Sequence, residues 1–492
     1  MQGLGIAVGI VGKAMAMSYN LLDEKWIPVL YGDGRCQRVG IVAALAEAGE
    51  IRQIAASNPM DRVAILRFLM AILYWCQGNP PADQEKSRIV EAGRFPKEWF
   101  AKLHKNRECF NLLGDGKRLF QDVTARRKRT TTDLIQEIPT GNNFWHFRHS
   151  TDGEEGLCPA CCALGLLRLP LFSVSGLPDL KAGINGTPPV YVVPVGASLL
   201  RTLCLNWIKC DSIGTPAWEV SDVVAQDGQA VPLLAGLTLV SRRVWLHAPV
   251  SPQGACIACG RRELELIRAC EYQSAGAQRN EHWDDPHVVY VDKGDDRRSL
   301  TTPDLTKSFF KLDKPWVSLF SAMVSSRKYQ FEQMPVGLLV VGFATDKAKN
   351  IDIWERTCSL PPRESADVDG GKCAETLDAW QNEGGRLPLR MRTKKDRRRR
   401  VELGAALTAI RPHVESRVSG NIAGLLGHPD EAWPAAVDEY RRMMPVIASA
   451  LAPGFTTRAL QRQNQIKSAV PNMQNEPEPK AKKAKARKGE GK

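Results

Sequence analysis

The sequence has 492 residues, enough for two or three domains, and its formal net charge of +13 favours a polyanionic partner, nucleic acid before membrane. Thirteen cysteines in so long a chain do not indicate a secreted disulfide scaffold, so we interpret them as reduced thiols and metal ligands of a cytoplasmic protein. The apolar run at 64–75 is too short for a bilayer and contains Arg67, which argues against a membrane-spanning segment.

The N-terminal part predicts a short strand followed by helices. Residues 3–11 are apolar but lack the basic flank of a signal peptide. We therefore interpret residues 1–16 as an extension ahead of a domain that begins near Met17. The expected elements are a strand within 19–30 and helices at 41–48, 58–76 and 86–103. Asp61 near the start of the helix at 58–76, and Gly78 after its end, are ordinary boundary signals.

Two cysteine pairs are the most informative feature of the chain. They share the spacing Cys-x-x-Cys and consist of Cys158, Cys161, Cys256 and Cys259. Each pair can offer two thiolates to one tetrahedral zinc, and a metal bound by both would join distant segments of the fold. Pro159 and Gly260 suit the tight turns that such pairs need. We predict a closed, structural zinc site; the alternative is four ordinary buried thiols. Cys162 is expected to be a spectator.

The remaining pattern changes from short strands to helices. We expect a helix at 161–169, then strands at 190–195, 238–246 and 288–291. Apolar residues recur at helical spacing in 401–412, 413–426 and 431–451, as in a small bundle. The predicted fold class is α+β, with a large mixed body at 17–365, a C-terminal helical bundle at 366–468 and a disordered basic tail at 469–492.

Several short motifs follow one another in an order that is specific to one family. They are NLLDEKWIPV at 20–29, GNNFWHF at 141–147, LKAGINGTPP at 180–189, WDDPH at 283–287 and IDIWERT at 351–357. Together with the two cysteine pairs, this series resembles the large subunit of the type I-E CRISPR surveillance complex Cascade, the CasA family. The resemblance implies an α+β body that carries the zinc site, followed by a four-helix bundle.

The resemblance implies a task that is not enzymatic. The complex carries a guide RNA (crRNA) together with other Cascade subunits, and guide–target pairing reads most of the DNA sequence. The large subunit is expected to recognise a short motif in double-stranded DNA, the PAM, and to start the strand separation that leads to an R-loop. It is also expected to help recruit the helicase–nuclease that degrades the target. These partners place the protein in the cytoplasm, with no membrane partner.

Carried over by position, the family's DNA-reading parts fall at separate points of the chain. The glycine loop corresponds to Ser175 and Gly176, where a missing Cβ lets the backbone approach base edges. The lysine finger corresponds to Lys293, and Lys347 stands at the wedge tip, where the family often has glutamine. Lys349 is the next residue of the wedge to test. The alternatives are an ordinary turn at Gly176 and a solvated hairpin lysine at Lys293.

Two further stretches are expected to contact nucleic acid. The guide-contacting loop of the family corresponds to Asn143, Phe144 and Trp145, whose rings could stack on an unpaired base or instead fill an interface or the core. A basic run precedes the bundle and could follow phosphates of the displaced strand: Arg397, Arg398, Arg399 and Arg400. The alternative for this run is a solvated helix face.

Two rival functions come from other classes. The first is a stand-alone zinc-ribbon DNA-binding regulator, which the wide gap between the cysteine pairs disfavours. The second is a metal-dependent nuclease built from histidines and aspartates, namely His146, His149, His282, His287, Asp284 and Asp285. No HExxH motif, P-loop or nucleophile elbow accompanies those residues, so we predict a protein that is not an enzyme.

Overall fold

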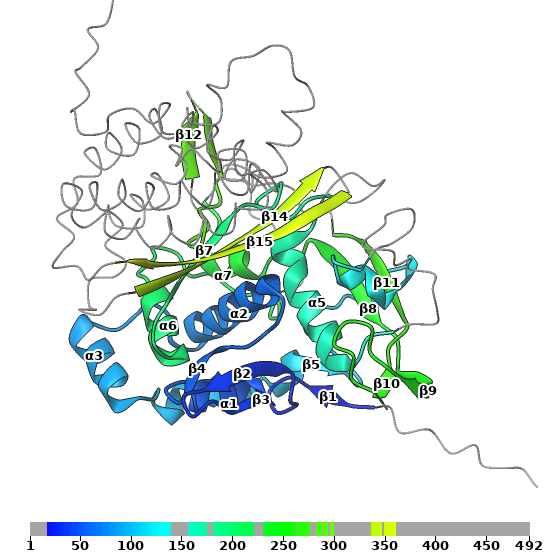
Figure 1. Cartoon of the computed structure of the whole chain (residues 1–492), viewed down its shortest axis with the longest axis horizontal. Helices are drawn as coiled ribbons and strands as arrows, with labels where there is room; N and C mark the ends of the chain where they lie inside the picture. The colour runs from blue at the N-terminus through cyan, green and yellow to red at the C-terminus, as the bar shows by residue number, and fades with distance from the viewer. Residues whose placement is uncertain are drawn as a thin grey trace, which may run out of the picture. The chain divides into compact units, whose positions relative to one another are not determined.

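The computed structural model describes residues 17–138, 156–174, 181–220, 230–262, 264–275, 282–288, 290–293, 296–299, 336–346 and 349–360. These residues form helices and mostly antiparallel sheets in alternation, which agrees with the predicted α+β body (Figure 1). The predicted extension at 1–16, bundle at 366–468 and tail at 469–492 lie outside them. Among the described helices, none is both long and apolar enough to cross a membrane.

A small sheet and a short helix open the fold. Strand β2 (Ile27–Tyr31) lies between β3 (Cys36–Val39) and β4 (Ile51–Ile54), and α1 (Ile41–Ala46) connects the outer two. The strand expected within 19–30 is divided in two. The division arises because the carbonyl of Asn20 accepts hydrogen bonds from Asp23 and Glu24, which turns the chain. The first part, β1 (Tyr19–Asn20), pairs with β5 (Asn111–Leu113).

Helix α2 (Pro59–Gln77) is the central element of the body, and its boundaries follow the sequence signals. Asn58 caps it, since its side chain accepts a hydrogen bond of 2.8 Å from the amide of Met60, and Gly78 ends it with a φ of 77°. Residues on every side of the helix are buried, and it contacts α5, α6 and α7 (Figure 1). Such a helix offers little solvent to its charged residues, so that Asp61 and Arg67 are buried while Arg62 is partly exposed.

The single helix expected at 86–103 is wrong. The chain instead forms α3 (Asp83–Ala92), the 3-10 turn η1 (Lys97–Phe100), α4 (Ala101–Lys105) and a second turn, η2 (Arg107–Phe110). Gly93 stops α3 in the left-handed conformation, with a φ of 68°, and Pro96 three residues later lacks the amide that would continue a helix.

Two further layers complete the body. Helix α5 (Pro159–Phe172) packs against α2, and the sheet β15 (Lys349–Leu360), β14 (Val336–Asp346), β7 (Tyr191–Val195) is antiparallel in that order. The strand predicted at 190–195 is therefore confirmed. The remaining helices here are α6 (Leu199–Asn206) and α7 (Leu233–Thr238). The strand predicted at 238–246 begins later than expected, at β8 (Arg242–Leu246), because residues up to Thr238 belong to α7.

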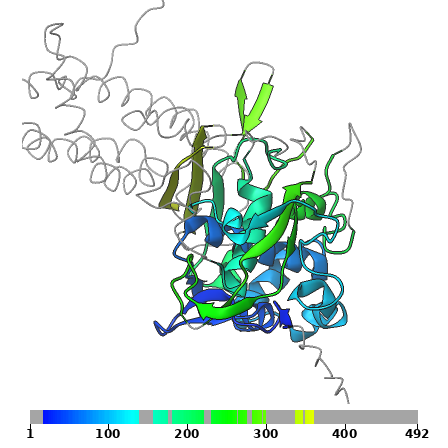
Figure 2. The same ribbon diagram turned by 90° about the vertical axis from the view of Figure 1, so that its right-hand side faces the viewer.

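The last sheets bring distant parts of the chain together. Strand β11 (Ala269–Ser274) pairs with both β8 and β6 (Lys128–Thr130), and the turn η3 (Thr131–Leu134) follows β6. Strands β9 (Val250–Gly254) and β10 (Leu264–Leu266) form a hairpin. A second hairpin joins β12 (Tyr290–Lys293) and β13 (Asp296–Ser299), whose strands lie side by side in Figure 2.

Candidate metal centre and loop anchors

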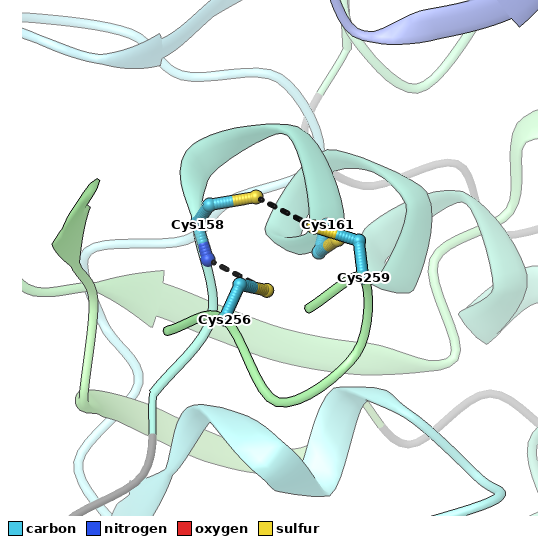
Figure 3. A group of neighbouring side chains, drawn as sticks. All are labelled: Cys158, Cys161, Cys256 and Cys259. Atoms are coloured by element: carbon cyan, nitrogen blue, oxygen red, sulfur yellow. Dashed lines mark hydrogen bonds between the residues drawn. The ribbon is translucent and has the colours of Figure 1, made fainter. Parts of the chain in front are cut away.

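The four predicted cysteines lie together, although they come from two distant elements (Figure 3). Cys158 is the N-cap residue of α5 and Cys161 lies in its first turn. Cys256 and Cys259 lie in the connection between β9 and β10. All four Sγ atoms are within 4.8 Å of one another, and those of Cys158 and Cys259 are 3.9 Å apart. Tetrahedral Zn–S bonds of about 2.3 Å would require sulfurs about 3.8 Å apart, so this cluster could hold such an ion.

Backbone hydrogen bonds explain why the second pair curls around its site. The amide of Cys256 donates to Arg261 O at 2.8 Å, and the amide of Gly260 donates to Cys256 O at 2.8 Å. Gly260 has a φ of 70°, a conformation that glycine adopts without strain. Gly156 pairs with Cys256 as an isolated bridge, which brings the start of α5 onto the hairpin. The predicted tight turn at Gly260 is thus confirmed.

Contacts among the four thiols shift their pKa values in opposite directions, downward for Cys158 and Cys259 and upward for Cys161 and Cys256. Hydrogen bonds from Cys161 and Cys256 lower the pKa of Cys158 to about 6, and hydrogen bonds from Cys158 and Cys161 lower the pKa of Cys259. Arg261 Nη2 also donates to Cys158 Sγ at 3.4 Å. Cys162 lies outside the cluster and is fully buried, and this burial raises its thiol pKa, as expected for a spectator.

A buried ion pair holds two of the family-like motifs together. Arg67 of α2 donates to both carboxylate oxygens of Asp285, at 2.5 and 3.0 Å, and both side chains are almost fully buried. Asn185 Nδ2 donates to Asp285 Oδ2 at 3.0 Å. The segments GINGTPP and WDDPH are therefore anchored to the same guanidinium–carboxylate pair. Burial opposes ionisation of Asp285, but Arg67 outweighs it, so that the pKa of this carboxyl is lowered.

His287 belongs to the same network, and its hydrogen-bond partners select one tautomer of the imidazole ring. Arg67 Nη1 lies 3.0 Å from His287 Nδ1 and can only donate, so Nδ1 is the acceptor. Nε2 lies 3.1 Å from Asn206 Oδ1, while Asn206 Nδ2 donates to two backbone carbonyls, so Nε2 carries the hydrogen. Of the residues weighed for a nuclease, Asp285 and His287 thus have structural partners. His146 and His149 lie outside the described residues.

A second buried arginine supports the chain ahead of the predicted guide-contacting loop. Arg168 of α5 donates to both carboxylate oxygens of Asp61, at 2.5 and 2.8 Å, and to Glu137 Oε2 at 2.5 Å. Asn58 Nδ2 donates to Glu137 Oε1 at 2.5 Å. Residues up to 138 are therefore tied to α2 and α5. Among the residues that the structure describes, three or more His, Cys, Asp or Glu ligand atoms gather only at the four cysteines.

The structure shows the hairpins on which two of the predicted DNA-reading residues stand. Lys293 ends β12 and pairs with Asp296 of β13. In the other hairpin Asp346 pairs with Lys349, and only residues 347 and 348 lie between them. The remaining predicted contact residues lie outside the described part of the chain: Ser175, Gly176, Lys347, Asn143, Phe144, Trp145, Arg397, Arg398, Arg399 and Arg400.

Sequence reasoning missed the buried arginines as anchors. The sequence pattern presents Arg67 only as a charge that disfavours a membrane span, and it gives Arg168 no evident role. The signal available is a cation inside an apolar helix or strand, as in AILRFLM around Arg67 and LLRLPLF around Arg168. A cation buried in such a place needs acceptors elsewhere in the fold.

Comparison with known proteins places these features in a family. Residues 20–377 match the model of the family described as CRISPR-associated protein Cse1, a span that includes both cysteine pairs and all five motifs. A CasA/Cse1 protein of Thermus thermophilus is 31% identical over 215 residues, which cover 41% of this chain and 42% of that relative. The chain thus spans less than half the length of this curated relative in that alignment.

Solved structures share the fold over most of the chain. The crystal structure of Thermobifida fusca Cse1 has a TM-score of 0.63 at 16% identity and covers 92% of this chain and 97% of its own. A chain of a CRISPR RNA-guided surveillance complex, in a structure described as pre-nicking, has a TM-score of 0.59 at 16% identity. It covers 93% of this chain and 100% of its own.

Proposed function

Because this chain belongs to the CRISPR-associated Cse1 family, we propose that it is the large subunit of an RNA-guided CRISPR surveillance complex of the Cascade kind. Its partners in this proposal are the other Cascade subunits and the guide RNA. The observation that carries the proposal is the family match across 20–377. The likeness to a chain of a surveillance complex supports it. With these partners the protein acts in the cytoplasm.

The four cysteines are proposed to hold one structural zinc ion. Four thiolates complete a tetrahedral shell and leave no open position for water or substrate, so the ion would supply folding energy and no catalysis. Its role would be to tie the start of α5 to the β9–β10 hairpin. That tie also positions Gly156 and Leu157, where the chain leaves the predicted guide-contacting loop.

Duplex recognition is proposed to use three points of the chain. Backbone amides at Ser175 and Gly176 would approach base edges of the PAM, and Lys293 would reach into the minor groove. Lys347, at the tip of the β14–β15 hairpin, would hold the first base pair open. Support comes from the two hairpins, because the last paired residues, Lys293 with Asp296 and Asp346 with Lys349, leave only two residues between the strands of each hairpin.

The proposal assigns the remaining nucleic-acid contacts to the guide RNA or to the target DNA. Asn143, Phe144 and Trp145 would contact the guide RNA or its neighbouring subunits, while Lys349 and the arginines at 397–400 would meet DNA phosphates. Recruitment of the helicase–nuclease would supply the chemistry that this subunit does not perform. The rival interpretation as a stand-alone regulator predicts a protein that purifies without guide RNA, which co-purification from the native host would test.

The wedge proposal is tested by substituting Lys347. We expect Lys347→Ala to impair R-loop formation on fully paired DNA, because opening the first step costs a few kcal/mol, roughly, in unstacking. The same variant should bind normally to a target whose first base pairs are already open. Lys347→Gln should keep most of the activity, since a wedge needs bulk and polarity more than charge.

Lys349→Ala is the comparison variant in the same hairpin, and as a proposed phosphate contact it should weaken binding to both targets alike. R-loop formation can be followed by permanganate footprinting of the complex on paired and pre-opened targets. Equal loss on both targets would mean that Lys347 makes a general phosphate contact. No loss at Lys347, together with a loss at Lys349 that is confined to the paired target, would show that the wedge residue lies two positions further along the chain.

A further inference from the structure

Arg242 is a buried cation that none of the functions above uses. It begins β8 and is 2% exposed, whereas the next residue, Arg243, points to the other face and forms an ion pair with Asp122 at 3.3 Å. The two neighbours therefore offer a natural comparison. They have the same chemistry on the same strand, but one is inside the body and one is at its surface.

The guanidinium of Arg242 bridges two points that flank one short segment of the chain. Its Nη2 donates to Val174 O at 2.8 Å, and its Nη1 donates to Lys181 O. Val174 and Lys181 are the residues on either side of segment 175–180, which contains Ser175 and Gly176. One planar side chain thus holds both ends of the segment at a set separation.

Other contacts of Arg242 hold the guanidinium itself in place. Nη1 also donates to Ser241 O at 2.9 Å, and Nε donates to the hydroxyl of Tyr272 at 3.3 Å. Tyr272 lies on β11, which pairs with β8. The clamp is therefore built on two adjacent strands of one sheet, and not on the segment that it holds.

Neighbouring hydrogen bonds fix the same two ends. On the incoming side, the Ser241 hydroxyl has one hydrogen to donate and lies 2.7 Å from Ser173 Oγ and 2.8 Å from Leu169 O. On the outgoing side, the amide of Lys181 donates to Ser274 Oγ at 3.4 Å. Both ends of the segment are consequently attached to strands β8 and β11, with Arg242 as the group common to the two sides.

We propose that Arg242 is a positioning residue that sets the geometry of segment 175–180 for reading duplex DNA. This inference rests on the proposed function for its DNA part, while the clamp itself is a property of the folded chain. A guanidinium suits the task because it donates in two directions at once, which an ammonium group on a flexible stem cannot reproduce. Two ends held at a set separation restrict the conformations open to any chain segment between them.

The first test measures the clamp without DNA. Amide hydrogen exchange of the full chain is compared for the parent, Arg242→Lys and the matched control Arg243→Lys. We expect exchange between 174 and 182 to accelerate by roughly ten- to a hundredfold in Arg242→Lys only, as expected for loss of hydrogen bonds from a charged donor. Exchange in α2 and β14 should stay unchanged.

A milder variant keeps the proposal testable if Arg242→Lys does not fold. Tyr272→Phe removes the acceptor of Arg242 Nε and keeps the guanidinium, so it should give a smaller acceleration at the same amides. Faster exchange throughout the body in both variants would show that Arg242 serves core stability alone. Unchanged exchange between 174 and 182 in both variants would overturn the proposal.

The second test measures recognition by the assembled complex. The probe is a set of DNA duplexes that match the guide and carry a randomised short motif beside the match. Arg242→Lys should lower the ratio between the best and the average motif by roughly tenfold. It should leave binding to a pre-opened target unchanged, whereas a merely structural defect would weaken both.

The two possible failures are distinguishable. If the parent complex itself shows no preference among motifs, the proposed function fails, and the exchange result alone then decides on the clamp. If the parent discriminates and Arg242→Lys discriminates equally well, Arg242 does not position the reading segment, and the inference is wrong.

Discussion

At the scale of single residues, the cysteine cluster depends on which sulfurs face one another. Cys158 and Cys259 are near neighbours although the chain between them is long, while Cys162, adjacent to Cys161 in sequence, points elsewhere. The reason is the helix: Cys158 and Cys161 lie on one side of the first turn of α5 because residues three apart share a face. Sequence adjacency is therefore no guide to ligation.

Cys158→Ser or Cys256→Ser should release the metal and lower thermal stability strongly, because ligation and folding are coupled. Cys162→Ala should cost only about 1 kcal/mol, as for an ordinary buried side chain. Zinc content by mass spectrometry and thermal unfolding would check both. A purified parent with much less than one zinc per chain, together with ligand variants as stable as the parent, would contradict the prediction.

At the scale of elements, buried arginines join helices to loops. Arg67 connects α2 to the segment at 283–287, and Arg168 connects α5 to both α2 and Glu137. Each pair is bidentate and buried, so removing one partner leaves a charge without compensation. The two arginines thus fix the segments around Asp285 and Glu137 to the helices. Each of these segments lies next in sequence to one that is proposed to contact nucleic acid.

Asp285→Asn should destabilise the protein by about 3–5 kcal/mol at neutral pH, because Arg67 would lose its buried counter-charge. Asp284→Asn, a change at the exposed neighbour, is the comparison variant and should destabilise the protein much less, since that carboxylate is not buried. Chemical denaturation at pH 7 would measure both free energies of unfolding. Equal effects of the two variants would mean that the ion pair contributes nothing specific.

The same pair predicts a dependence on pH. The native pKa of Asp285 is lowered, since Arg67 outweighs burial, so the unfolded state binds a proton first as the pH falls. Its contribution is present above the unfolded pKa of about 4 and is lost as pH falls through the lower native value. The difference in unfolding free energy between the parent and Asp285→Asn should therefore shrink below about pH 4. A difference that is constant from pH 7 to 3 would contradict this.

At the scale of the whole molecule, the net charge of +13 predicts salt-sensitive association with DNA. Replacing Arg397, Arg398, Arg399 and Arg400 with Glu should weaken target binding by the complex and flatten its salt dependence by about one unit of slope for each phosphate that is no longer neutralised. The same reversal at Lys482, Lys483, Lys485 and Arg487 in the tail is the control, with a smaller effect. Binding titrations between about 50 and 200 mM salt would measure the slopes. An unchanged slope would remove 397–400 from the DNA path.

The sequence by itself determined the parts of this protein that depend on neighbouring residues. Asp61 and Gly78 predicted the limits of α2, and the spacing of the two cysteine pairs predicted a four-thiol cluster, because a helix boundary and a Cys-x-x-Cys pair are each local features with few alternatives. The same local reasoning failed at 86–103, where the helical pattern on either side hides the breaks that Gly93 and Pro96 introduce.

Only the tertiary structure decided the partners of the buried charges. Arg67 and Asp285 are 218 positions apart, and Arg242 meets Val174 at a separation of 68. Any carboxylate or carbonyl could satisfy a buried guanidinium, so composition and spacing leave the choice open. The path of the chain makes the choice, because only the groups that the packed helices and strands bring within about 3 Å can compensate for the lost hydration of the charge.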